Sequence, residues 1–219
     1  MMTYMLEILP SLLDGVKMTL SIFGLTIIGA IPLGMILAVG LTYQPKRWLG
    51  KLGHDLLSGY VWIFRGTPLL LQLIFVFYGL PILHIVFDRY SAALVAFILN
   101  YAAYFAEIFR GGFLAIDNGQ FEASALLNMT RMQTLRYVVM PQVVKIVLPS
   151  VGNEVINLVK DSSLVYVIGL GDLLRAGNIA SARDVTLVPL VMVGLIYLLL
   201  TLGLTVLLKR LEKAFAYYR

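Results

Sequence analysis

Three polar side chains recur at helical spacing within an apolar stretch, where they could bind a charged solute. Glu154, Asn157 and Asp161 are separated by three and four residues, so an α-helix would place them on one face. Ionisable groups at membrane depth are costly, and those that occur usually face a cavity or one another. Two carboxylates on one face can bind an ammonium group or a cationic side chain, so this stripe is a candidate binding site.

A second candidate group precedes a proline in an earlier apolar stretch. Arg65 is followed by Gly66, Thr67 and Pro68, and proline removes one backbone donor and frees nearby carbonyl groups. Interrupted helices at membrane depth are tolerated where protein or water covers them, and in transporters they line binding sites. Arg65 could bind a carboxylate through its forked guanidinium group, or it could pair with an acid for assembly alone. The predicted substrate-binding residues are Arg65, Thr67, Asn100, Glu154, Asn157, Asp161, Ser162 and Ser163.

Several polar residues in and near this set also have purely structural interpretations. Ser162 and Ser163 could donate to helix carbonyl groups. Lys160 points away from the acidic stripe and could extend to the interface or pair with the aspartate beside it. Glu107 and Arg110 are three residues apart near one end of a span, so we expect a local ion pair there instead of a ligand contact.

The residue types present argue against covalent, metal and nucleotide chemistry. Cysteine is absent, and the two histidines, His54 and His84, are far apart in the sequence, so neither a thiolate nucleophile nor a histidine metal cluster is expected. No GxxxxGK[ST] phosphate loop occurs, and no basic run with interleaved aromatic residues, so the chain is not expected to bind ATP or nucleic acid. We therefore predict no catalytic residue, no metal site and no cofactor.

The composition indicates that the elements holding these residues lie in a membrane. The 219 residues are 60% hydrophobic and 13% charged, whereas a soluble domain has about 25% charged residues. Residues 1–16 are expected to form a short interfacial helix on the outer face, without a removable signal peptide. Apolar stretches predict five spans, at about 18–42, 57–82, 90–112, 146–169 and 186–208.

The distribution of basic residues sets the orientation. Hydropathy leaves the fourth span doubtful because acids and a lysine interrupt it. If it does span and the N-terminus lies outside, most of the 17 Lys and Arg residues fall on the cytoplasmic side, as the positive-inside rule requires. The outer side then holds only Lys17, Arg89, Arg175 and Arg183. The predicted fold is an all-α membrane protein with five transmembrane helices, N-out and C-in.

A polar segment, residues 117–145, separates the third and fourth predicted spans. Asp117 or Asn118 is expected to cap a short helix. Asn128 tolerates a left-handed turn, since Asn adopts that conformation more readily than other non-glycine residues. A second short helix is expected over 129–140, with Pro141 at the start of the next span. On these features alone, the segment is either a partner-free connector or a surface that receives force from a soluble protein.

The spacing of this segment and its flanks resembles one family. The relevant residues are Glu122-Ala123-Ser124, Asn128 and Met140-Pro141, with AAYFAEIFRGGF at 102–113, PSVGNEVINLVKDSSLVYVIG at 149–169 and RGTP at 65–68. Over residues 15–212 the chain resembles the permease subunits of bacterial ABC importers of polar amino acids, which carry an EAA loop. It departs from the family pattern with Ser124 in place of the second Ala and Asn128 in place of Gly.

The resemblance implies a type I importer (MetI-like) permease fold in a single domain, residues 1–219, within the bacterial cytoplasmic membrane. The implied partners are a cytoplasmic ABC ATPase dimer, an extracytoplasmic substrate-binding protein, a second permease protomer that is identical or different, and membrane lipid. The loop 117–145 would couple to the ATPase, and the outer loop 170–185 is a candidate docking surface for the binding protein. The implied coupling residues are Glu122, Ala123, Ser124, Asn128 and Pro141.

The resemblance also gives the polar residues a role. An amino acid substrate would present its ammonium group to Glu154 or Asp161 and its carboxylate to Arg65. Glu122 would be the characteristic acid of the loop, although it could equally be a solvated carboxylate favoured by the helix dipole. The alternative function is a stand-alone, ion-coupled carrier with Glu154 and Asp161 as a proton relay. An intramembrane enzyme lacks support, because no nucleophile and base are in register.

Overall fold

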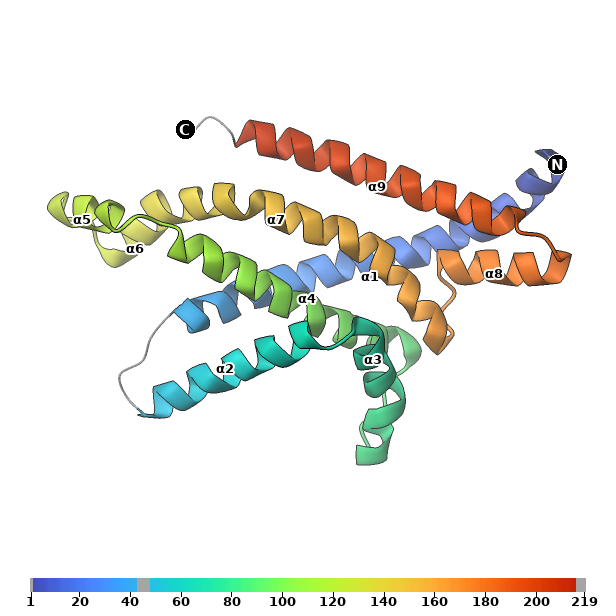
Figure 1. Ribbon diagram of the computed structural model, residues 1–219, viewed down its shortest axis with the longest axis horizontal. Helices are drawn as coiled ribbons and strands as arrows, with labels where there is room; N and C mark the ends of the chain where they lie inside the picture. The colour runs from blue at the N-terminus through green and yellow to red at the C-terminus, as the bar shows by residue number, and fades with distance from the viewer. Residues whose placement is uncertain (1, 43–47, 216–219) are drawn as a thin grey trace.

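The structure, a computed structural model, describes residues 2–42 and 48–215 and is an elongated sheaf of helices (Figure 1). Its helices are α1 (Met2–Thr42), α2 (Trp48–Gly66), α3 (Leu69–Ile74), α4 (Arg89–Leu114), α5 (Asn118–Leu126), α6 (Arg131–Thr134), α7 (Met140–Asp161), α8 (Leu173–Asp184) and α9 (Val188–Ala214), with π-helical turns η1 (Phe75–Gly79) and η3 (Leu135–Val139) and 3₁₀ turns η2 (Leu80–Leu83) and η4 (Ser162–Ile168). No strand occurs in this part of the chain, which confirms the all-α class. The start of α1 and α8 lie at one end, and α5 and α6 at the other.

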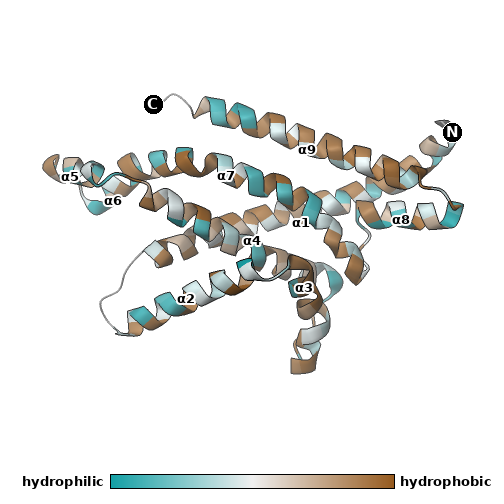
Figure 2. Ribbon diagram, viewed as in Figure 1, coloured by the Kyte–Doolittle hydropathy of each residue, from teal (hydrophilic) through white to brown (hydrophobic). Residues whose placement is uncertain are grey.

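Four helical segments are long and apolar enough to cross a membrane, and a fifth span is obtained if the bent pair α2 and α3 to η2 is counted as one. The four are Thr3–Thr42, Arg89–Leu114, Arg131–Ile168 and Val188–Ala214. Figure 2 shows apolar residues spread over α9 and α3, with polar residues gathered near the C-terminal end of α9. The segment at Arg131–Ile168 confirms the doubtful fourth span.

Helix α4 forms the centre of the packing. It lies against α1, α2, α3 and α7, and its buried alanines, Ala92, Ala93 and Ala96, allow close approach. Gly34 of α1 faces α4 so closely that an added Cβ would lie 3.0 Å from the carbonyl oxygen of Ala102. The polar residues of α4 are therefore held on a firmly packed helix.

The N-terminal segment differs from the prediction. Residues 1–16 do not form a separate interfacial helix, because α1 continues without a break from Met2 to Thr42. Ile8 and Leu12 are buried against Leu173 and Val193, and these tertiary contacts favour continuation of the helix. A helix of 41 residues is about 60 Å long, roughly twice the thickness of the hydrocarbon core, so part of α1 lies outside it.

The predicted second span is broken. Its helix begins at Trp48 and ends at Gly66, and the chain then bends by 106° before the segment Leu69–Leu83. Pro68 lacks a backbone N–H and has extended torsion angles, φ −63° and ψ 134°, so α2 cannot continue through it. The predicted span over 57–82 therefore corresponds to a bent helix pair, which counts as the fifth span when both parts are taken together.

The junction before the fourth span also differs from the prediction. The second short helix does not end at Pro141, because Arg131–Ile168 is helical throughout. The π-helical turn Leu135–Val139 immediately precedes Met140. In a π turn each N–H donates to the carbonyl five residues back. The helix can therefore pass through Pro141, although Pro141 has no N–H to donate.

Candidate functional site

The break between α2 and α3 is held together by side-chain amides. Asn100 of α4 is buried, and its Nδ2 donates to the carbonyl oxygen of Phe64 at 3.1 Å and to Oε1 of Gln72 at 3.0 Å. Gln72 Nε2 donates to the Phe64 carbonyl at 3.0 Å and to Thr67 Oγ1 at 2.7 Å. The Thr67 hydroxyl donates to Ile63 O at 2.8 Å. Two predicted substrate ligands, Thr67 and Asn100, thus satisfy backbone carbonyl groups next to the break.

The break lies near the middle of α4. Asn100 is eleven residues from the start of α4 at Arg89, about 17 Å, and fourteen from its end at Leu114, about 21 Å. Because the hydrocarbon core is about 30 Å thick, this position corresponds to mid-depth of a membrane. The exposed side chain of Arg65, at the end of α2, lies at the same level and would be costly to place in lipid.

A run of polar and aromatic contacts extends from this break to the end of α7. The guanidinium carbon of Arg65 lies 5.5 Å from the centre of the Tyr104 ring, a cation–π contact. The rings of Tyr101 and Tyr104 are 6.4 Å apart, and the Tyr101 hydroxyl donates to Oδ2 of Asp161 at 2.8 Å. We call Arg65, Tyr101, Tyr104 and Asp161 the polar cluster.

The remaining predicted ligands lie on α7 and η4 next to this cluster. Glu154 and Asn157 are half-buried and lie on α7, seven and four residues before Asp161. The serine hydroxyls have other partners. Ser162 donates to Val159 O and Ser163 to Lys160 O, each at 2.7 Å. The structural interpretation accounts for both serines, and their role as ligands stays a prediction.

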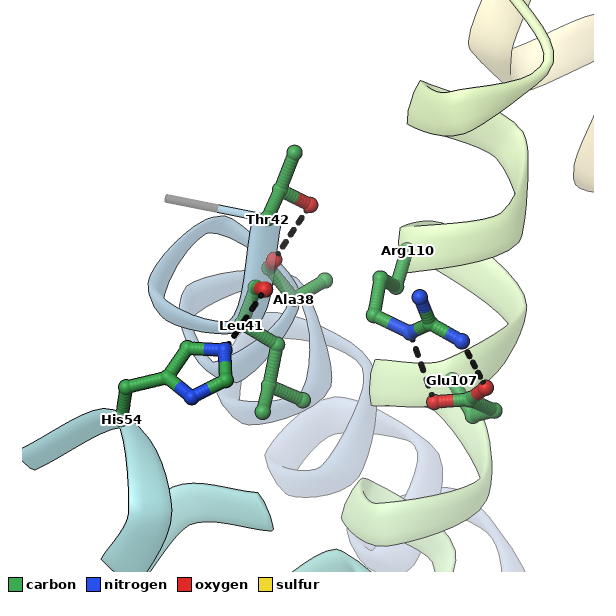
Figure 3. A network of polar contacts seen from close by, with 6 residues as sticks. All are labelled: Ala38, Leu41, Thr42, His54, Glu107 and Arg110. Carbon is green, nitrogen blue, oxygen red and sulfur yellow. Dashed lines mark hydrogen bonds and ion pairs between the residues drawn. The ribbon is translucent and has the colours of Figure 1, made fainter. Parts of the chain in front are cut away.

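The sequence interpretation missed two residues of this region and correctly identified one ion pair. Tyr101 and Gln72 were not among the predicted residues, and their partners lie 60 and 28 residues away in the chain. The sequence signal for Tyr101 was its position directly after Asn100 in the apolar third span. Glu107 and Arg110 form the predicted local ion pair on α4, with two hydrogen bonds (Figure 3). His54 of α2 is not part of this ion pair; its Nε2 lies 3.3 Å from the carbonyl oxygen of Leu41 at the end of α1.

Two hollows lie outside the polar cluster. One of about 630 Å³ opens at the cytoplasmic end, between Thr42, Phe113, Phe121 and Leu135. The other, of about 510 Å³, opens at the outer end beside α1 and α8. No predicted substrate ligand lines either hollow. Within residues 2–42 and 48–215, no group of three or more His, Cys, Asp or Glu side chains is arranged to hold a metal ion.

The predicted coupling loop begins with a capped helix. The Asp117 carboxylate accepts a hydrogen bond from the backbone N–H of Gly119 at 2.7 Å, so Asp117 is the cap of α5. Glu122 and Ala123 of α5 are exposed. Ser124 is buried, and its hydroxyl donates to Gln120 O at 2.7 Å. A hydroxyl at this position is therefore satisfied within the helix.

The end of α5 has a defined turn. Asn128 adopts a φ of 53°, which confirms the predicted left-handed conformation. The N–H of Asn128 donates to Ala125 O, and the N–H of Met129 donates to Ser124 O, both at 3.0 Å. This pair of bonds closes a helix at a left-handed residue. Thr130 then begins α6 with a reciprocal capping box.

The tip of the loop is apolar and open. Leu126 is 85% exposed, Leu127 75% and Met132 70%. They are exposed although the neighbouring helix ends, the end of α5 and the start of α6, are capped by hydrogen bonds. Leu126 and Leu127 lie outside the candidate membrane spans, where large exposed apolar side chains indicate a protein interaction site. Behind them, Gln142 of α7 donates to Gln120 of α5 at 3.2 Å, which links α5 to the start of the fourth span.

Comparison with known proteins gives matches to one family over most of the chain. The family model described as "Binding-protein-dependent transport system inner membrane component" matches residues 30–217. The arginine transport system permease protein ArtQ of Bacillus subtilis (strain 168) is 40% identical over 209 residues, covering 94% of this chain and 92% of ArtQ. The glutamine transport system permease protein GlnP of Escherichia coli (strain K12) is 34% identical over 208 residues, with 94% and 93% covered. A crystal structure of an amino acid ABC transporter with histidines superposes with a TM-score of 0.87 at 33% identity, and covers 97% of each chain.

Proposed function

Because the chain belongs to the family of binding-protein-dependent transport system inner membrane components, we propose that it is the permease subunit of an ABC importer of polar amino acids in the bacterial cytoplasmic membrane. It is not an enzyme, and ATP hydrolysis is carried by separate subunits. An ABC ATPase, a substrate-binding protein and a second permease protomer are its partners. In this proposal the chain makes and breaks no covalent bond, and its conformational change opens and closes a path for the solute.

The observation that carries the proposal is the construction of α5. A helix that is capped at both ends and linked to α7 presents Glu122, Leu126 and Leu127 to the cytoplasm. In this proposal the ATPase binds this surface, and its closure upon ATP binding pulls α5. The continuous helix from Arg131 to Ile168 then transmits the displacement toward Asp161.

The proposal is tested by reconstitution. The purified chain is expected to co-purify with its ATPase and to import amino acids in liposomes only when ATP and the binding protein are present. Glu122→Arg is expected to abolish uptake, whereas Asp55→Arg, which alters an exposed acid on α2, leaves uptake near wild type. Normal uptake by Glu122→Arg contradicts the coupling role. Full-rate uptake by the chain alone, driven by an ion gradient, establishes a stand-alone carrier instead.

We assign the solute path to the polar cluster and Glu154. Arg65 and the two acids, Glu154 and Asp161, supply both charges that a zwitterionic amino acid requires. Arg65 is exposed on the chain at mid-membrane depth, so it needs a covering by protein or water. A second permease protomer facing the cluster would enclose it as a central cavity.

Glu154→Gln tests this assignment. The variant retains a side chain of the same shape and is expected to lower uptake about tenfold or more while ATPase assembly persists, since one charged hydrogen bond contributes about 1.5–3 kcal/mol. Ser163→Ala is the matched control, because that hydroxyl already binds Lys160 O. Unchanged uptake and substrate affinity in Glu154→Gln would remove Glu154 from the path.

A further inference from the structure

Two guanidinium groups from different helices meet over a glycine at the outer end of the chain. Arg89 is the first residue of α4, and Arg175 lies in the first turn of α8. Arg89 Nε and Arg175 Nη1 each lie 3.5 Å from the point that a Cβ on Gly169 would occupy. Gly169 has a φ of +82°, a conformation that suits glycine, and its missing side chain leaves room for both arginines.

Neither arginine has an acidic partner within the part of the chain that the structure describes. No carboxylate oxygen lies within 4.0 Å of either guanidinium among residues 2–42 and 48–215. The acids beside them in sequence are engaged elsewhere. Asp88 accepts from the backbone of Tyr90 and Ser91, and Asp172 accepts from the backbone at the start of α8. Two like charges that converge without a counter-charge repel each other until an anion binds between them.

The surroundings of this arginine pair suit an incoming side chain. Arg175 is half-buried and donates to Tyr166 O at 3.4 Å, which fixes it on η4. The outer hollow of about 510 Å³ adjoins it and is also lined by Ser21, Tyr90 and the ion pair of Asp14 with Lys17, in which Asp14 Oδ1 lies 2.8 Å from Lys17 Nζ. Figure 1 shows the starts of α4 and α8 and the end of the fourth span close together, at the end opposite α5.

The pair also lies in line with the solute path. Arg89 is twelve residues before Tyr101 on α4, about 18 Å further toward the outer side. Asp161, the partner of Tyr101, leads through η4 to Gly169. The arginines therefore stand above the polar cluster along α4 and η4, whereas the apolar face that suits lipid lies on α9, with exposed Leu198 and Leu202.

We propose that Arg89 and Arg175 form a docking site for an acidic side chain of the substrate-binding protein, an inference that rests on the proposed importer function. A carboxylate binds both guanidinium groups, because each offers planar, forked donors that match its two oxygens. Docking at this point places the opening of the binding protein over the outer mouth of the polar cluster.

The experiment uses the complete permease–ATPase complex in nanodiscs and the purified substrate-binding protein. The variants are Arg89→Gln, Arg175→Gln and the double variant. Arg183→Gln is the matched control, because Arg183 also lies on α8 but already binds Asp184 through two hydrogen bonds. We expect the double variant to raise the Kd for the binding protein about tenfold and to flatten its dependence on NaCl, since charge pairs at an interface are salt-sensitive. The control is expected to change Kd less than about twofold.

Three further measurements accompany the Kd: basal ATPase activity, the Kd in nanodiscs of two lipid compositions, and ATP-dependent uptake by the wild-type complex. Basal ATPase activity equal to wild type shows that the variants have folded and assembled. An unchanged Kd with an unchanged salt dependence overturns the proposal. A loss that occurs only in phosphatidylglycerol nanodiscs and not in phosphatidylcholine nanodiscs also overturns it, because the arginines then bind lipid phosphate. Failure of the importer function itself is distinct, since the wild-type complex would then show no ATP-dependent uptake.

Discussion

The two ends of the molecule are built in opposite ways. At the outer end, α1, α8 and the start of α9 pack against one another. The Tyr4 hydroxyl donates to Asp184 at 2.6 Å, and a small core buries Ile8, Leu12, Leu173 and Val193. At the cytoplasmic end, α5 and α6 have complete caps but exposed apolar side chains. The outer end is stabilised by its own contacts, whereas the cytoplasmic end is ordered by local hydrogen bonds.

Because of this difference, substitutions at the two ends should have different effects: one end should affect the free energy of unfolding, and the other the binding of a partner. Substitutions at the outer end remove contacts within the chain, so they should lower the free energy of unfolding. Substitutions on the exposed surface of the cytoplasmic end remove contacts that only a partner makes, so they should affect assembly and leave stability unchanged. Substitutions at Asp172, Gly15, Asn128 and Leu127 distinguish the two ends, with the largest effects on stability expected at the outer end.

The pH dependence of the outer end is the largest expected effect. Asp172 lies outside the membrane spans, between the segments Arg131–Ile168 and Val188–Ala214. Burial raises its pKa from 3.8 to about 6. Between those values the folded chain holds a proton that the unfolded chain has released, so stability falls as pH rises from about 4 to about 6. A shift from 3.8 to about 6 corresponds to about 3 kcal/mol.

Thermal unfolding of wild type and Asp172→Asn at pH 4 and pH 7 checks this expectation. Asn caps a helix as well as Asp does but does not titrate, so the difference between the two pH values should be smaller in the variant. An equal pH response in both proteins would show that Asp172 does not titrate in this range.

Close packing of α1 on α8 gives the next largest effect. A Cβ added at Gly15 would lie 2.7 Å from Leu173 Cα and 2.9 Å from Asp172 O. Because both are backbone atoms, the helices must separate, and Gly15→Ala should cost about 2 kcal/mol. Gly24→Ala is the control, since nothing lies within 4 Å of its added Cβ. Equal unfolding midpoints for the two variants would contradict the packing seen at the outer end.

The cap of α5 should contribute less. Asn128→Val places a β-branched residue at a φ of 53°, which costs about 1–2 kcal/mol. Asn128→Gly should be close to neutral, because glycine adopts this conformation freely. Limited proteolysis at the loop and the unfolding midpoint measure the effect. If Asn128→Val is as stable and as protease-resistant as Asn128→Gly, the cap does not order the cytoplasmic end.

The features predicted correctly from the sequence depend on neighbours in the chain. The left-handed turn at Asn128, the cap at Asp117 and the ion pair of Glu107 with Arg110 all arise within a few residues. Apolar length identified the membrane segments other than the fourth, and the distribution of basic residues indicated that one. Local pattern was therefore enough for the helical class and for α5 with the turn that follows it, but not for the junction at Pro141.

The features that differ from the prediction depend on contacts between distant segments. The 106° bend after α2 could be anticipated at Pro68, but its stabilisation by Asn100 requires a residue on another helix. Tyr101 gains its role from Asp161, 60 residues further on. The extension of α1 through residues 1–16 depends on Leu173. Side-chain spacing within one helix contains none of this information.

Leu127 gives the smallest effect on stability and the clearest separation of the two ends. It is 75% exposed at the end of α5, so Leu127→Ser removes almost no contact within the chain, and the unfolding midpoint should stay at the wild-type value. Affinity for the ATPase should fall about tenfold or more if Leu127 fills a pocket on that partner, as apolar anchors at interfaces do. Leu6→Ser is the control: Leu6 is 62% exposed at the outer end, and its loss should change neither stability nor ATPase binding. A lowered unfolding midpoint for Leu127→Ser would mean that the cytoplasmic end, like the outer end, is held by its own side chains. Equal ATPase affinities for the two variants would mean that the apolar tip of the loop is not the surface that receives force.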